Sequence, residues 1–220
     1  MVGHFQEFED EYLEMMYEFY EHDPSVHVRT GELAEKLSVS PASVTEMLRR
    51  LASKDLVIYT PYKGAKLTDA GLEHGRRMKR RHRLAELLLD VLPFTGDAHE
   101  TACRLEHAID DDLELCLSLL FSTISEDPSG REIPEPDEQI LQRLNEAKQQ
   151  YFLLSEAPKQ QRCMISAMFF LPQQAKIMNE QGLKVGQTFV KIGTILQFEN
   201  GHACELNQDI SSKIVVKIVD

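Results

Sequence analysis

Tryptophan is absent from this sequence, and cysteine is scarce, with four residues and no Cys-x-x-Cys pair. A chain of 220 residues that is 42% hydrophobic can bury a core without cross-links, so a disulfide framework is not expected. No apolar run approaches the ~18 residues of a membrane span. The acidic N-terminus also lacks the basic region that opens a secretory signal. We therefore expect a cytoplasmic protein of about two domains.

Positive charge is also in short supply, because 24 Lys and Arg face 36 Asp and Glu, a formal net charge of −12. The positive charge is nevertheless concentrated, since residues 24–83 hold 13 basic residues and six acids, a net +7. A single basic block is what a phosphate-contacting surface requires. The acids on both sides of the block are either solvated helix faces or ligands for cations.

The first 75 residues have the pattern of a winged helix-turn-helix. Apolar spacing predicts a helix over 6–21 and a second one, capped by Thr30, over 31–38. Ser40 and Pro41 are typical of the start of a third helix, over 41–55. Two short β-rich runs around Pro-Tyr-Lys-Gly then predict a hairpin over 56–68. A hairpin directly after such a helix pair is the wing.

The remaining sequence predicts a mainly α protein with a small β domain at its end. A long helix capped by Thr68 and one or two further helices over 97–124 precede a proline-rich loop, and a linking helix covers 138–150. Strand-like runs around 185–199 and 213–219, with an Asn-Gly turn, predict a small SH3-like barrel. We expect a DNA-binding domain over 1–75, a helical metal-binding and dimerisation domain over 76–136, a linker over 137–150 and the barrel over 151–220.

The third helix would enter the major groove with its N-terminal residues against the base edges. Small side chains there allow close approach but no strong bidentate contact, so readout of DNA shape is expected to contribute. The predicted base-facing residues are Ser40, Pro41, Ala42, Ser43, Thr45 and Glu46. The predicted phosphate contacts are Arg29, Arg49, Arg50, Lys54, Lys63 and Lys66. The alternative is a generic three-helix domain whose basic residues are merely solvated.

Several His, Glu and Cys residues recur at helical spacing and could bind a metal. Residues three or four apart share a helix face, so each pair can present two donors to one point. Mixed imidazole, carboxylate and single-thiolate donors suit Fe(II), Mn(II) or Co(II), and can accept Zn(II) or Ni(II). Each residue alone could instead be a core or surface residue. The candidates are Glu11, Glu14, His82, Glu86, His99, Cys103, Glu106 and His107.

The sequence resembles the diphtheria toxin repressor family of metal-dependent regulators. The matching stretches fall in order over most of residues 8–136 and include LAEKLSVSPASVTEMLRRLASKDLV, HRLAE and ACRLEH. The resemblance implies a homodimer on a palindromic DNA operator and an SH3-like (FeoA-type) C-terminal domain. It also implies an activating metal site from Glu11, Cys103, Glu106 and His107, and an ancillary site from His82, Glu86 and His99.

This chain departs from the family pattern at a few positions. Glu11 stands where iron-type members have Met and manganese-type members Asp, and a carboxylate favours Mn(II) or Fe(II) over softer ions. Cys103 and His99 match the iron type, so we favour Fe(II). Leu171 replaces an ancillary-site Glu while Gln174 matches its partner, and the anion site would keep Arg83 but has Asp127 in place of Ser.

The mechanism we expect is a population shift, in which metal binding favours the arrangement of the winged domains that fits DNA. Metal-uptake or metal-homeostasis genes are the expected targets. Three alternatives are a winged-helix regulator that senses a small organic ligand, a metal-dependent hydrolase and a metal-storage protein. The sequence contains no H-E-x-x-H or Ser-His-Asp pattern, and storage would not require a wing.

Overall fold

The computed structural model describes residues 3–170 and 172–219. The chain forms two compact units, Met1–Leu141 and Gln142–Asp220. The first unit holds both the winged helix and the helices that follow it, and the division falls inside the segment predicted to link the domains. The boundary expected at residues 75 and 76, between the DNA-binding domain and the helical domain, stays a prediction.

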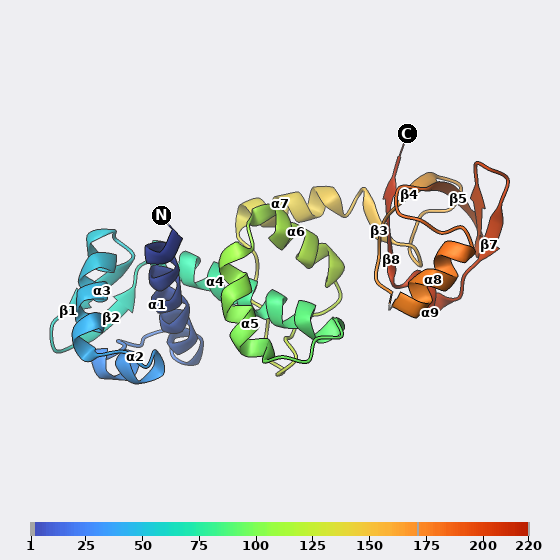
Figure 1. Ribbon diagram of the computed structural model, residues 1–220. Helices are drawn as coiled ribbons and strands as arrows, with labels where there is room; N and C mark the ends of the chain where they lie inside the picture. The colour runs from blue at the N-terminus through green and yellow to red at the C-terminus, as the bar shows by residue number, and fades with distance from the viewer. Residues whose placement is uncertain (1–2, 171, 220) are drawn as a thin grey trace. The chain divides into compact units, whose positions relative to one another are not determined.

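The winged helix forms as the sequence pattern predicts (Figure 1). It consists of α1 (Gly3–His22), α2 (Thr30–Lys36), α3 (Pro41–Ser53), β1 (Val57–Thr60) and β2 (Gly64–Leu67). One face of each helix is apolar, so the three helices close over a common core. The fully buried side chains that the helices contribute to this core are Leu13, Leu33, Val44, Leu48 and Leu51.

Local capping sets where two of these helices begin. Ser40 caps α3 as predicted, because its Oγ accepts a hydrogen bond from the Ser43 amide at 3.1 Å. The prediction that Thr30 caps α2 is wrong, because Thr30 is the first helical residue. The exposed Arg29 amide instead donates to the Glu32 carboxylate at 2.8 Å, so an acid in the first turn satisfies the backbone.

The wing is a two-stranded antiparallel hairpin in which Val57 pairs with Leu67 and Thr60 with Gly64. Val28, which precedes α2, forms a bridge to β2 and anchors the hairpin to the helices. Gly64 has a φ of +107°, and a Cβ there would lie 2.5 Å from the Val28 carbonyl oxygen. This position therefore requires glycine.

The helical region begins with α4 (Asp69–Val91), which leaves the wing and runs into the next group of helices (Figure 1). It is followed by α5 (Ala98–Leu105), the 3₁₀ turn η1 (Glu106–Ala108), α6 (Asp111–Leu120) and α7 (Glu138–Ala147). Leu84, Ala85 and Ala102 are buried where α4 packs against α5. Within the described ranges, no helix combines the length and hydropathy needed to span a bilayer.

The second unit contains a six-stranded antiparallel sheet with the order β3-β8-β4-β5-β6-β7. It confirms the fold class: two helical regions followed by a small β domain. The strands are β3 (Tyr151–Leu153), β4 (Arg162–Met168), β5 (Thr188–Ile192), β6 (Ile195–Phe198), β7 (Ala203–Glu205) and β8 (Ile214–Ile218), with helices α8 (Pro172–Glu180) and α9 (Gln208–Ser211).

The predicted runs correspond to β5, β6 and β8, and the Asn200-Gly201 turn joins β6 to β7. The sequence pattern missed β3 and β4. Only Cys163 and Ile165 are fully buried in β4, and the residues around them give a weak alternating signal.

Candidate metal centre and nucleic-acid interface

The centre of the candidate metal site is His82, on the buried face of α4. Its side chain is 1% exposed, and its Nδ1 lies 2.6 Å from Glu106 Oε2. The other ring nitrogen, Nε2, lies 3.2 Å from Glu86 Oε1, one helical turn along α4. Glu14 of α1 approaches Nδ1 to 3.9 Å. One imidazole therefore faces carboxylates from three elements.

The packing of α1, α4 and α5 brings these donors together. His82 and Glu86 share a face of α4 because they are four residues apart. After α5 the backbone changes from an α-helix to the 3₁₀ turn η1. Glu106, the first residue of this turn, has a buried side chain that is 1% exposed. Ile109, directly after η1, is buried in the helical core and holds the turn in place.

A second group of donors lies on the other side of the His82 ring. His99 Nδ1 is 3.1 Å from Glu86 Oε1, and Cys103 Sγ is 4.0 Å from His99 Nε2. The rings of His82 and His99 meet edge to face, with centroids 4.9 Å apart. Within each of the two sets His82–His99–Cys103 and Glu14–His82–Glu106, the potential ligand atoms lie within 4.8 Å of one another.

The electrostatics of this cluster favour a positive charge at its centre. Burial lowers the pKa of His82, but its contacts with Cys103, Glu106 and Glu86 outweigh burial and raise it to about 11. Burial raises the pKa of Glu106 to about 7 despite the nearby His82. Burial also acts on Glu86, but His82 and His99 bring its pKa down to about 2. The buried acids thus stabilise a cation beside them.

The donors present fit a divalent first-row metal ion. His82 Nε2 is buried and makes no hydrogen bond with any described residue, although Glu86 Oε1 lies 3.2 Å away without hydrogen-bond geometry. A buried nitrogen of this kind calls for a partner. Imidazole, carboxylate and a single thiol at such spacing are ligands that Fe(II), Mn(II), Co(II), Zn(II) and Ni(II) accept.

The structure groups the predicted ligands differently from the two sets that the resemblance implies. His82 contacts Glu106, which had been assigned to the other set, and Glu106 Oε1 lies 3.6 Å from His107 Nε2. Glu11 is exposed, and the potential ligand groups include Glu14 from α1 instead. The roles of all eight residues as ligands stay a prediction.

Sequence reasoning missed two residues next to this cluster. Asp10 of α1 lies 2.6 Å from His74 Nε2 through Oδ1 and 3.4 Å from His107 Nδ1 through Oδ2. The signal for Asp10 was its spacing, because Asp10 and Glu14 are four residues apart and share a face of α1. His74 gave no signal, because its partner lies 64 residues earlier in the chain.

Asp127 has a structural role in this conformation. Its side chain is fully buried, and its Oδ2 accepts a hydrogen bond from Arg131 Nε at 2.6 Å. Arg131 in turn donates to Glu86 Oε2 at 2.7 Å, while Arg83 Nε lies 3.8 Å from Asp127. The buried Asp127 carboxylate lies beside Arg131 and Arg83, the cations that an external anion would need. Gln174 is an exposed residue of α8 in the second unit, and Leu171 lies outside the described residues.

The N-terminal end of α3 presents the small side chains expected of a helix that faces DNA. Thr45 is partly buried and its hydroxyl donates to the Pro41 carbonyl at 2.9 Å, which leaves its methyl group for contact with bases. The hydroxyls of Ser40 and Ser43 lie 2.8 Å apart and also bond to each other. The remaining positions are exposed, namely Ser40, Pro41, Ala42, Ser43 and Glu46.

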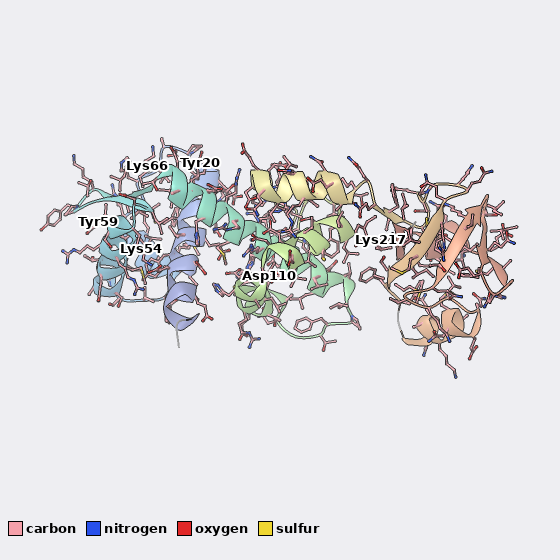
Figure 2. The ribbon with its side chains drawn as sticks, turned by 90° about the horizontal axis from the view of Figure 1, so that it is seen from above. Tyr20, Lys54, Tyr59, Lys66, Asp110 and Lys217 are labelled. Carbon is pink, nitrogen blue, oxygen red and sulfur yellow. The ribbon has the colours of Figure 1, made fainter. Side chains whose placement is uncertain are left out.

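The predicted phosphate contacts fall into two groups. Arg29, Arg49 and Lys63 are exposed, while Lys66 is partly buried on β2. Arg50 and Lys54 are instead held by the buried Glu9 of α1, at 2.6 Å each. Lys54, labelled in Figure 2, extends from the end of α3 toward α1. In this conformation, Arg50 and Lys54 tie α3 to α1.

The wing also presents side chains that the sequence pattern did not single out. Tyr62 at its tip is fully exposed, with a φ of +65°, and Ile58 is 60% exposed. An exposed aromatic ring beside Lys63 gives the wing both an apolar and a cationic contact for a nucleic-acid surface.

The winged-helix fold and the cluster of acids and imidazoles around His82 together define the class of this protein. It is a winged-helix protein with a carboxylate–imidazole centre beside its DNA-binding helices. Two family models match the chain: the N-terminal DNA-binding domain of iron-dependent repressors over residues 4–65, and their metal-binding and dimerisation domain over residues 68–135. The chain belongs to the family of iron-dependent repressors.

Individual relatives agree with this assignment. An uncharacterised HTH-type transcriptional regulator of Methanocaldococcus jannaschii is 36% identical over 108 residues, which are 47% of this chain and 84% of the relative. The diphtheria toxin repressor of Corynebacterium efficiens is 27% identical over 236 residues, covering 95% of this chain and 94% of its own length. The structure of the manganese regulator SloR has the same fold, with a TM-score of 0.51, 24% identity and coverage of 96% and 98%.

Proposed function

We propose that this protein is a metal-dependent DNA-binding repressor of metal-uptake or metal-homeostasis genes, activated by Fe(II) or Mn(II). One observation carries the proposal. Glu14 lies on α1, the first helix of the winged helix, and its carboxylate meets His82 of α4 and Glu106 of η1 at a potential metal site. Occupation of this site would tie the DNA-binding helices to the helical region.

The residues that would hold the metal are those of the cluster. Glu14 and Glu106 lie on one side of His82, with His107 next to Glu106, while Glu86, His99 and Cys103 lie on the other side. A bound divalent cation supplies the positive charge and directed bonds that hold these acids together. Carboxylates outnumber the single thiol, which favours Mn(II) and Fe(II), and Co(II), Ni(II) or Zn(II) would substitute.

The switch is a shift in population between arrangements of α1. Metal binds more tightly to the arrangement in which Glu14 reaches His82 and Glu106, so it favours that arrangement by its differential affinity. Because Glu9, on the same helix, holds Arg50 and Lys54, the position of α1 also sets the position of α3. The active species is a homodimer that presents two recognition helices to a palindromic operator.

The test begins with DNA selection, because the operator is unknown. Random-sequence duplexes are selected with the protein under anaerobic Fe(II), under Mn(II) and with chelator. We expect a palindromic motif that is enriched only with metal, and binding that Glu106→Ala abolishes while the circular dichroism spectrum is unchanged. Equal binding with metal and with chelator would exclude the metal switch and favour a sensor of organic ligands, while ester or phosphoester turnover by the metal-loaded protein would favour a hydrolase.

Arg49 provides a separate prediction for the DNA surface. It is exposed on α3, beside Arg50, which is held by Glu9. We expect Arg49→Ala to weaken binding to the selected motif and to unrelated duplexes alike, and to lower the salt slope of log Kd by about 1, as loss of one phosphate contact requires. Fluorescence anisotropy at several salt concentrations measures the slope. Arg104→Ala, which removes an exposed arginine from α5, is the matched control and should leave the slope unchanged.

A further inference from the structure

Asp10 is a buried acid that bridges two imidazoles of the first unit. It is 8% exposed, and its Oδ1 lies 2.6 Å from His74 Nε2 on α4. Its other oxygen, Oδ2, lies 3.4 Å from Nδ1 of His107 on η1. Burial disfavours its charge, but contacts with His107 and His74 outweigh burial and lower its pKa to about 2. Asp10 therefore joins α4 to η1 through its two carboxylate oxygens.

His107 is oriented so that only one of its nitrogens faces the metal cluster. Its Nε2 lies 3.6 Å from Glu106 Oε1, which also belongs to the cluster around His82. Its Nδ1 is buried and makes no hydrogen bond within residues 3–170 and 172–219. The Asp10 carboxylate is the acceptor beside that nitrogen. A carboxylate behind a ligating imidazole fixes its tautomer and orientation and raises its basicity.

We propose that Asp10 is a positioning residue for His107, and that His74 holds Asp10 in place. Asp10 accepts the Nδ1 proton of His107, so that Nε2 carries the lone pair presented to the metal. This inference rests on the proposed function, because it assumes that His107 is a ligand. It adds Asp10 and His74 to the residues that determine metal affinity, although neither is expected to touch the ion.

The same carboxylate makes metal affinity depend on the position of α1. Asp10 follows Glu9, whose carboxylate holds Arg50 and Lys54 of α3. Consecutive residues of a helix point roughly 100° apart. One turn of α1 therefore contacts α3 through Glu9 and η1 through Asp10. Loss of either acid would disturb this turn of α1, so the control for Asp10 is an acid of another helix.

The test is a titration of the purified full-length chain with Co(II), without DNA. We expect Asp10→Ala to weaken Co(II) binding by roughly 10–100-fold in isothermal titration calorimetry, the usual cost of losing such a partner. The visible d–d absorption bands of the Co(II) protein should also shift. Asp10→Asn keeps an oxygen acceptor and should recover part of the affinity, while Glu35→Gln, which changes an exposed acid of α2, should keep the affinity and spectrum of the wild type.

Wild-type affinity and an unchanged Co(II) spectrum in Asp10→Ala would overturn the positioning role and leave the proposed function intact. Loss of affinity with unchanged bands, and without recovery in Asp10→Asn, would show that Asp10 only supports packing and would also overturn it. Absence of Co(II) binding in the wild type would overturn the proposed function itself. His74→Gln keeps a side-chain donor toward Asp10 and should lie between the wild type and Asp10→Ala.

Discussion

Replacement of His82 by alanine is expected to abolish the response of DNA binding to metal. Its ring is the common member of both donor groups, facing Glu106 and Glu14 with Nδ1 and Glu86 with Nε2. Coupling free energies between two sites are typically about 1–3 kcal/mol, a roughly 5–150-fold change in affinity. In His82→Ala the ratio of DNA affinities with and without Mn(II) or Fe(II) should fall to about one.

The variant also removes one of the positive charges beside the buried acids of the metal-free protein, where Arg131 also pairs with Glu86 and Lys79 with Glu14. Its thermal unfolding must therefore be compared with that of the wild type, and His82→Gln, which keeps a polar group of similar length, provides a second variant. His27→Ala, which removes an exposed imidazole from the winged helix, should keep the full metal response. A metal response of wild-type size in folded His82→Ala would contradict this account of the site.

The largest expected effect on stability is that of Gly71→Ala, in the first turn of α4. A Cβ at this position would lie 1.8 Å from the Leu56 carbonyl oxygen and 2.8 Å from its carbon, both of them backbone atoms. The same oxygen accepts a hydrogen bond from the Thr68 amide at 3.1 Å, so it cannot move without loss of that contact. Overpacking costs about 3 kcal/mol here, against a helix-propensity gain of about 1 kcal/mol.

We therefore expect Gly71→Ala to lower the free energy of unfolding by about 2 kcal/mol or more, measured by urea denaturation of the metal-free protein. Gly31 on α2 is the matched control, because a Cβ there meets nothing within 4 Å. Gly31→Ala should stabilise the protein by about 0.5–1 kcal/mol. A destabilisation of similar size in both variants would show that the close approach at Leu56 is not the cause.

The DNA-binding half of the protein could be predicted from the sequence because its signals are local. Ser40 before Pro41 defines the start of α3, and Thr68 defines the start of α4, through side-chain caps to amides three residues later. The hairpin follows directly from its turn residues. The basic block, residues 24–83, places a net charge of +7 on the segment that holds α2, α3 and the hairpin. These features depend on neighbours in the chain and hold without knowledge of the packing.

The β domain was predicted less completely because its sheet depends on distant pairings. β8 lies between β3 and β4, so Val216 pairs with both Phe152 and Ile165, more than 50 residues earlier. Such register is set by which faces are buried together and leaves little trace in a short segment. The hairpin of β6 and β7 was found because an Asn-Gly pair joins them directly.

By itself, the sequence determined the class of fold, the starts of α3 and α4 and the set of residue types able to bind a metal. Only the tertiary structure decided which acids of α1 reach that site. Glu9 faces α3, Asp10 and Glu14 face the imidazoles, and Glu11 is exposed. The rotation of α1 is set where it packs on α4, since a Cβ at Gly75 would lie 2.5 Å from the Leu13 carbonyl oxygen. Helical periodicity places residues on a common face, but only this close contact determines which face meets the metal cluster.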